Sequence, residues 1–402
     1  MQRIAKNFWR LTVLLGLATA LAAAGYYLLL LWKLERITDI QLHVGILQKV
    51  LRGQGSVPAN FGFYAVVRIA SGFSERPGYL LAAAIGVIGL AWGGLVTASG
   101  YAGADLLKRR LVGEEVATPL PGPLLLLLAA AGSCLLFPLP ASAEGWYLGL
   151  LPPNVYHNST IICALPFSVL AFVLGVKRLT ATRPPALAHD LALSLVLVLG
   201  AVFKPSYAFA FGPAFAVLFG RQFGLRLPTL GRLAVVLLPV LLVVAGQLLW
   251  TRQHPHDTLY GASTLAVGWP AGWRTFVPDF GPARVAACAA SSLLVPAVAY
   301  ALRPVWLQRP AHQLAVGSLL AGLLLFLLVH ETGLRARHGN FIWQVVAANH
   351  VLHWLILLEA LTWIPADAGQ SRRKKLLLGL LAIEVVSGVV YLVSSLFRGV
   401  YQ

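Results

Sequence analysis

Acidic residues are scarce in this sequence. Of its 402 residues, 14 are aspartate or glutamate and 31 are lysine or arginine, and charged residues make up 11% of the chain. About a quarter of a soluble domain is charged, so this scarcity excludes an ordinary soluble domain. Hydrophobic residues reach 58%. Apolar runs of about 20 residues, long enough to cross a hydrocarbon core, recur along the chain. The sequence therefore predicts an integral, multi-pass protein of the lipid bilayer.

Cysteines are also few. Cys134, Cys163 and Cys288 lie in or beside apolar runs. An odd count without metal-type spacing favours neither a disulfide framework nor a zinc site, so we expect small core residues. No stretch resembles a phosphate loop, a nucleotide-binding fold or a haem attachment site. The net charge of +17 is typical of a membrane protein with basic cytoplasmic loops, and no nucleic-acid partner is expected.

The apolar runs predict an all-α, polytopic transmembrane helical bundle that forms a single domain over residues 1–402. We expect about eleven spans, with a range of roughly 10–13. The segment from Phe61 to Phe73 is semi-apolar, and we interpret it as an outer, re-entrant or interfacial piece. The predicted spans are 11–32, 78–101, 122–139, 160–176, 188–203, 206–220, 233–250, 283–301, 313–329, 341–363 and 376–397.

Basic residues alternate between loops. They gather in the amino-terminal segment and near residues 108–110, 177–183, 221–232, 303–309 and 372–375. By the positive-inside rule these loops are cytoplasmic, as is the amino terminus. The opposite, exoplasmic face then holds four loops, at about 33–77, 140–159, 251–282 and 330–340. We expect this arrangement in a bacterial inner membrane.

The exoplasmic loops share a second property, since ionisable side chains gather at the ends of their spans. Such groups are costly near hydrocarbon and tend to be functional. The stretch VHETGLRARHGNFIW, residues 329–343, is the densest example. The predicted substrate-binding residues of this face are His43, His157, Asn158, Lys204, Glu331, Arg335, Arg337, His338 and Asn340.

The first exoplasmic loop predicts an amphipathic helix at residues 39–52, lying on the membrane surface. Thr38 and Gln41 fit a capping box, and apolar residues repeat at helical spacing from Ile40 onward. Gly53 is a natural end for this helix. Asp39 lies in the first turn, where the helix dipole favours a carboxylate.

A first span, an acidic residue that opens an interfacial helix, and the pattern D…H…L..G…P…FY together resemble the GT-C glycosyltransferases. The resemblance covers the amino-terminal fifth of the chain and, loosely, its many-helix layout. It implies transfer of a sugar from a polyprenyl-phosphate donor to a glycan, lipid or protein acceptor on the exoplasmic face. It also implies that Asp39 is the general base. This sequence departs from the family in having no paired carboxylates in the loop and no large soluble carboxy-terminal domain.

The chemistry of glycosyl transfer assigns further roles. A carboxylate must take the proton of the acceptor hydroxyl, and Asp39 is the first candidate. If Asp39 merely supports the helix start, the base is sought at Glu144, His157 or Glu331. Cationic groups must stabilise the departing phosphate. Arg335 and Arg337 offer guanidinium forks suited to phosphate, and Lys204 is a further candidate; these cations could instead contact lipid headgroups.

No cofactor is assigned from the sequence. The stretch QHPHD, with His254, His256 and Asp257, fits no standard metal spacing, so a divalent metal stays open without support. His350, His353, Glu359 and Glu384 lie within spans, and we interpret the histidines as hydrogen-bonded core residues.

Three alternatives remain. An O-antigen ligase or polymerase-like enzyme would shift weight from Asp39 to Arg335, Arg337 and His338. A transporter or flippase of lipid-linked sugars would use internal repeats and charges near the membrane midplane, and no internal repeat is visible. A non-catalytic membrane subunit is the third alternative.

Overall fold

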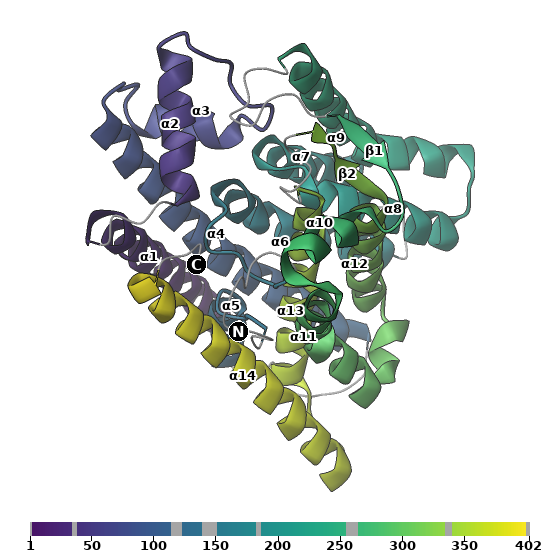
Figure 1. The fold of residues 1–402 in the computed structure, drawn as a ribbon. Helices are drawn as coiled ribbons and strands as arrows, with labels where there is room; N and C mark the ends of the chain where they lie inside the picture. Colours follow the sequence, from purple (N-terminus) through teal and green to yellow (C-terminus); the bar gives the residue numbers. More distant parts are fainter. Residues whose placement is uncertain are drawn as a thin grey trace.

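The computed structural model describes residues 2–33, 38–113, 123–138, 151–181, 186–254, 264–333 and 340–398. These residues form an all-α bundle with one small β-ribbon, which confirms the predicted fold class (Figure 1). The helices are α1 (Gln2–Lys33), α2 (Asp39–Leu51), α3 (Gly62–Ala70), α4 (Pro77–Gly113), α5 (Pro123–Ser133), α6 (Ser159–Leu179), α7 (Leu187–Phe203), α8 (Ser206–Phe223), α9 (Leu227–Gln253), α10 (Ala271–Phe280), α11 (Pro282–Leu302), α12 (Pro310–Leu328), α13 (Trp343–Thr362) and α14 (Ala368–Arg398).

Each of the predicted spans falls on a helix. Eight helices of the described chain are long and apolar enough to cross a membrane, namely α1, α4, α6, α9, α11, α12, α13 and α14. α5 and α7 are apolar but shorter. Lys204 and Pro205 separate α7 from α8, in agreement with the separate predicted spans 188–203 and 206–220. α3 has nine residues and, at about 1.5 Å per residue, is too short to cross a bilayer.

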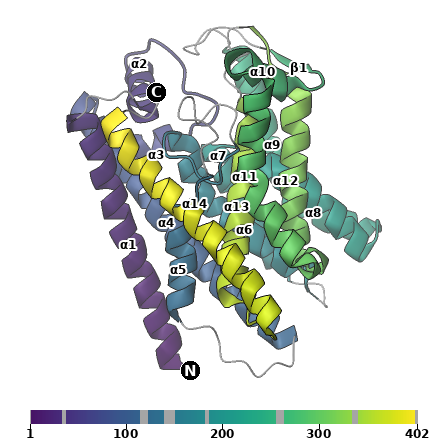
Figure 2. The same cartoon turned by 60° about the horizontal axis from the view of Figure 1, so that its bottom comes forward.

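The bundle has two unlike ends (Figure 2). One end, which we call the site end because most of the predicted site residues belong to it, holds α2, α3, the start of α6, the α7–α8 junction and the start of α13. The other, which we call the basic end after its lysines and arginines, holds the end of α6, the start of α7, and the α11–α12 and α13–α14 junctions. Figure 2 shows α2 and α10 at one end of the long helices and the amino terminus at the other. Because consecutive long helices run in opposite directions, loops that alternate in sequence meet at the same end.

The β-ribbon is a feature that hydropathy did not predict. β1 (Leu265–Val267) pairs antiparallel with β2 (Val329–Glu331), and Leu265 lies opposite Glu331. The Thr332 backbone N–H donates to the Thr264 carbonyl at 2.8 Å and extends the pairing. The ribbon joins two loops that the sequence analysis treated separately, and it carries Glu331.

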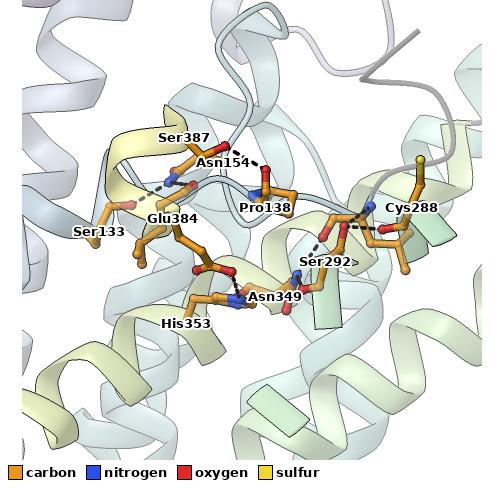
Figure 3. A network of polar contacts seen from close by, with 11 residues as sticks. Ser133, Pro138, Asn154, Cys288, Ser292, Asn349, His353, Glu384 and Ser387 are labelled. Atoms are coloured by element: carbon orange, nitrogen blue, oxygen red, sulfur yellow. Dashed lines mark hydrogen bonds and ion pairs between the residues drawn. The ribbon is translucent and has the colours of Figure 1, made fainter. Parts of the chain in front are cut away.

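α5 ends earlier than expected. The predicted span 122–139 is helical only to Ser133, and residues 134–138 continue as irregular, mostly buried backbone. Irregular backbone inside a membrane protein needs internal hydrogen-bond partners. Asn154 Nδ2 supplies two of them, donating to the Ser133 carbonyl at 2.6 Å and the Leu136 carbonyl at 2.8 Å (Figure 3). On α14, Ser387 Oγ donates to the Pro138 carbonyl at 2.9 Å.

α13 lies at the centre of the bundle and is buried on all sides, as its apolar sequence requires. Its polar residues hold the irregular segment 151–156. Asn349 Nδ2 donates to the Leu151 carbonyl at 2.7 Å, and His350 Nδ1 donates to the Pro153 carbonyl at 3.0 Å. These contacts agree with the interpretation of the histidines as hydrogen-bonded core residues. They also fix the path of the chain into α6, which begins at the site end.

Candidate functional site

α2 places Asp39 and His43 at the site end. The Thr38 backbone N–H donates to Gln41 Oε1 at 3.0 Å, as expected of the capping box. Ile40, Val44 and Leu47 are buried, which confirms the predicted apolar face. The helix ends at Leu51, and Gly53 follows with φ +70°, a left-handed conformation that glycine adopts without strain. Asp39 therefore opens a helix whose orientation is fixed by packing.

α3 surrounds His43 with aromatic rings. His43 Nδ1 and the Tyr64 hydroxyl share a 2.6 Å hydrogen bond, and the His43 ring centroid lies 5.4 Å from that of Phe63. α3 approaches α7 closely at Gly62, where an added Cβ would lie 2.8 Å from Val202 Cγ1. Only glycine fits this contact, which seats α3 against the end of α7, next to Lys204.

Asn158 links the start of α6 to Lys204. Its side-chain oxygen accepts from the Ile161 N–H at 3.1 Å, so Asn158 is the N-cap of α6. The same oxygen accepts from Lys204 Nζ at 3.3 Å. One amide thus caps a helix and holds the lysine at the α7–α8 junction.

Trp343 covers Lys204. The ammonium nitrogen lies 4.7 Å from the Trp343 ring centroid, a cation–π arrangement. The His157 ring packs edge-on against the same indole, with centroids 5.7 Å apart. Sequence reasoning missed Trp343. Its place at the start of a span is typical of interfacial tryptophan, so the sequence alone gave no reason to assign it to a site.

Glu331 and Asn340 form a further part of the site end. The Asn340 side chain donates a short hydrogen bond to the Glu331 carboxylate. A small open pocket lies beside them, and Thr275, His330 and Phe341 also line it. The pocket connects the β-ribbon, α10 and the start of α13.

Lys204 is the electrostatic centre of this cluster. Protein atoms crowd around its ammonium group, and this burial lowers the pKa of Lys204 to about 8, although the carboxylates of Asp39 and Glu331 act in the opposite direction. Burial also lowers the pKa of His43 to about 4 and that of His157 to about 3, with Lys204 adding to both shifts. Both imidazoles are therefore neutral at pH 7, and the positive charge resides on Lys204.

The site residues remain reachable from outside. Each of the six candidate residues gathered here is partly exposed. They are Asp39, His43, His157, Lys204, Glu331 and Asn340. Six of the predicted residues, together with the N-cap Asn158, thus meet at one end of the bundle, although they come from five separate parts of the sequence.

Several predicted residues lie outside the described residues, namely Arg335, Arg337, His338, Glu144, His256 and Asp257. His254 ends α9, where its ring stacks on Trp250 with centroids 4.1 Å apart. Glu359 lies at the basic end, paired with Arg309 at 3.0 Å. The three cysteines are free and buried, as expected. Among the described residues, no group of three His, Cys, Asp or Glu side chains could hold a metal ion.

No protein-family model, curated protein or solved structure matches this chain. The function is therefore argued from the geometry of the site end.

Proposed function

We propose that this protein is a GT-C-type membrane glycosyltransferase that uses a polyprenyl-phosphate sugar donor. The observation that carries the proposal is the position of Lys204, which contacts Asn158 and Trp343 at the site end and lies close enough to Asp39 and Glu331 for both carboxylates to act on its charge. These residues come from three distant loops, and they meet at the end of a membrane bundle where a lipid-linked substrate and a water-soluble acceptor can both arrive. A carboxylate and a cation are the two groups that glycosyl transfer with inversion requires.

The proposed reaction assigns one step to each group. The acceptor hydroxyl oxygen attacks the anomeric carbon of the donor, and the Asp39 carboxylate takes the hydroxyl proton. The bond between the anomeric carbon and the phosphate oxygen breaks, and its electron pair leaves with the lipid phosphate. Lys204 stabilises the negative charge that develops on this phosphate. Arg335 and Arg337, which follow Glu331 closely in the sequence, are proposed as further phosphate ligands on the strength of their guanidinium geometry.

Neutral His43 and His157 fit roles other than charge neutralisation. A neutral imidazole donates and accepts hydrogen bonds, and both rings lie close enough to Lys204 to feel its charge. We assign them, with Asn158 and Asn340, to the hydroxyl groups of the sugar and the acceptor. The Glu331–Asn340 pair and the adjacent pocket provide a second polar surface on the side of the β-ribbon.

A reconstitution experiment tests this function. The purified protein is placed in liposomes with radiolabelled polyprenyl-phosphate sugars and a mixture of glycan, lipid and peptide acceptors. We expect the label to move from the lipid to an acceptor. If the label crosses to the other leaflet while still attached to the lipid, the protein is a transporter and the enzymatic proposal is wrong.

The transporter alternative has one observation in its favour. α5 ends inside the bundle, and the irregular segment that follows is met by polar residues of α13 and α14. Broken helices that meet polar groups inside the bundle are typical of transporters. The ligase-like alternative depends on Arg335, Arg337 and His338, which lie outside the described residues.

The proposal also places the site end on the exoplasmic face. Cysteine introduced at Gly333 should react with an impermeant thiol reagent added to intact cells, whereas cysteine at Gly224 should not. The native cysteines are buried, so they contribute little background. The reverse labelling would put the site in the cytoplasm and remove the case for an exoplasmic transferase.

A further inference from the structure

A carboxylate and an imidazole face each other inside the bundle, away from the site end. His353 on α13 and Glu384 on α14 are both buried, and both lie in helices long and apolar enough to cross a membrane. His353 Nε2 lies 3.6 Å from Glu384 Oε1, within ion-pair range but beyond a hydrogen bond. Figure 3 shows the Glu384 carboxylate directed at the His353 ring.

Hydrogen-bond polarity constrains the protons of this pair. His353 Nδ1 lies 2.9 Å from the Asn349 carbonyl oxygen, which can only accept, so Nδ1 carries a hydrogen. A neutral His353 then presents a lone pair at Nε2 to the carboxylate. Glu384 Oε2 has no hydrogen-bond partner among the described residues. An ionised Glu384 beside a neutral His353 would thus be a buried charge without compensation.

Among the described residues, no cationic side chain other than His353 is paired with Glu384. Within the described chain, no lysine or arginine lies within salt-bridge distance of Glu384. An isolated buried carboxylate is strongly unfavourable, and such groups are neutralised by a cation or by a proton. We therefore expect a proton to neutralise the Glu384 carboxylate.

We propose that His353 and Glu384 bind one proton between them and form a proton-binding site within the bundle. The proton resides on Glu384 Oε1, giving a neutral acid and a neutral imidazole, or on His353 Nε2, giving an imidazolium and a carboxylate. Either form leaves the pair without net charge. This inference depends on the contacts between α13 and α14 and is independent of the proposed glycosyl transfer.

The pair is connected to the segment that leads into the site end. The Asn349 carbonyl accepts from His353 Nδ1, and the Asn349 amide donates to the Leu151 carbonyl. Residues 151–158 then run to His157 and Asn158. Two hydrogen bonds, from His353 to Asn349 and from Asn349 to Leu151, therefore connect the proton pair to the segment that carries the N-cap of α6.

The elements packed against α13 and α14 carry other buried titratable or charged side chains. Among the described residues these include His350 and Glu359 on α13, Tyr391 on α14, Cys163 and Arg178 on α6, Tyr207 on α8, Cys288 on α11, His312 on α12, Cys134 after α5 and Tyr156 before α6. Of these, His350 interacts electrostatically with His353. Its Nδ1 donates to the Pro153 carbonyl and its Nε2 has no hydrogen-bond partner among the described residues.

Thermal unfolding across pH tests the proposal, with the parent, Glu384→Gln and Ser387→Ala compared in the same detergent. An unfolded chain releases its histidine proton near pH ~6.5. Above that pH the folded parent holds a proton that the unfolded chain lacks, so its stability falls as pH rises. Glutamine is uncharged and can donate to His353 Nε2, so the unfolding temperature of Glu384→Gln should lose this pH-dependent fall.

Ser387→Ala is the matched control. It lies one turn further along α14, loses the hydrogen bond to Pro138 and keeps the proton pair, so its curve should run parallel to that of the parent at lower temperature. If the Glu384→Gln curve also runs parallel to the parent above pH ~6.5, the pair holds no proton and the proposal is wrong.

A spectroscopic measurement covers the case in which Glu384→Gln does not fold. His353→Gln removes the imidazole, so the proton must lie on Glu384. Infrared spectra at neutral pH should then show a protonated carboxyl band that shifts in deuterium oxide. The absence of this band in folded His353→Gln would overturn the proposal.

Discussion

At the basic end, buried charges contact opposite charges directly, whereas at the site end Lys204 contacts an amide and an aromatic ring. Arg178 Nε lies 3.0 Å from Asp190 Oδ1, and Arg232 Nη1 lies 3.0 Å from Asp190 Oδ2. Arg309 pairs with Glu359 at the same distance. By contrast, no carboxylate of the described chain lies within salt-bridge distance of Lys204 Nζ, which contacts the Asn158 amide oxygen and the Trp343 ring.

The difference separates charges that hold helices together from a lysine that an anion can still approach. Asp190 is fully buried and joins α6, α7 and α9. Both of its carboxylate oxygens contact arginines, so neither can bind a substrate. Lys204 keeps part of its surface exposed, and an anion could still approach it. Charged residues therefore join helices at the basic end, whereas Lys204 at the site end is held by an amide and an indole and stays partly exposed.

Asp190→Asn should give the largest effect, which is a loss of folding stability. It removes the charge that compensates Arg178, whose side chain is 5% exposed. Breaking one partner from a buried pair costs about 3–5 kcal/mol, measurable as a lower unfolding temperature. Asp105→Asn is the control, because its partner Lys177 is more exposed and such pairs contribute about 1 kcal/mol or less. Equal effects would show that burial does not distinguish the two pairs.

Asp39→Asn should leave stability almost unchanged and lower the transfer rate by about 10²-fold or more, as for loss of a general base. Asparagine is tolerated at helix starts, so α2 should persist. Transfer from the polyprenyl-phosphate donor and unfolding temperature are measured in parallel. A stable variant with the parental rate would exclude Asp39 as the base and favour the ligase-like alternative.

Lys204→Met should weaken donor binding by about 10- to 100-fold, since a hydrogen bond to a charged group contributes roughly 1.5–3 kcal/mol. Binding of a fluorescent polyprenyl-phosphate analogue measures this. Lys374→Met at the basic end is the matched control. There the Lys374 ammonium group donates to the Trp363 carbonyl at 2.6 Å, so donor affinity should not change. A similar loss in both variants would mean that the effect is general and not specific to the site.

The pH dependence of donor binding should be the smallest effect. Burial lowers the pKa of Lys204 to about 8, so the cation is present below this pH and is lost above it. Affinity should fall by at most about tenfold per pH unit above 8, as expected for one linked proton. Lys204→Arg keeps its charge throughout and should lose this dependence. Parallel curves for the two proteins would assign the titration to another group.

Much of the fold could be predicted from local pattern. Apolar runs located the long helices, because hydrocarbon thickness sets their length. The Thr38–Gln41 cap and Gly53 located the ends of α2, since these residues act on their own neighbours. The Lys204-Pro205 break followed from the missing N–H of proline.

The remainder depends on partners far away in the sequence. The run from Pro123 to Pro138 carries no charge and is mostly apolar, so hydropathy could not show that α5 stops at Ser133. That end depends on Asn154 and on α14. The β-ribbon has three residues per strand and joins distant loops. The residues of the site end were predicted one by one from their positions at span ends, but their meeting around Lys204 and Trp343 required the packing of the helices.

The irregular segment after α5 has a consequence for the biosynthesis of the protein. Its Pro138 carbonyl accepts from Ser387, 249 residues later, and the Phe137 N–H donates to the Glu384 carbonyl. Gly388 is packed against the Leu135 carbonyl so closely that no side chain would fit there. Chains emerge from the ribosome amino terminus first, so this segment enters the membrane long before α14 exists. Until α14 has been inserted, the Phe137 N–H and the Pro138 carbonyl lack these partners, so they stay unpaired or bind water. A chain truncated before α14 should therefore be recognised as unfinished by cellular quality control, although most of its long helices are already in place.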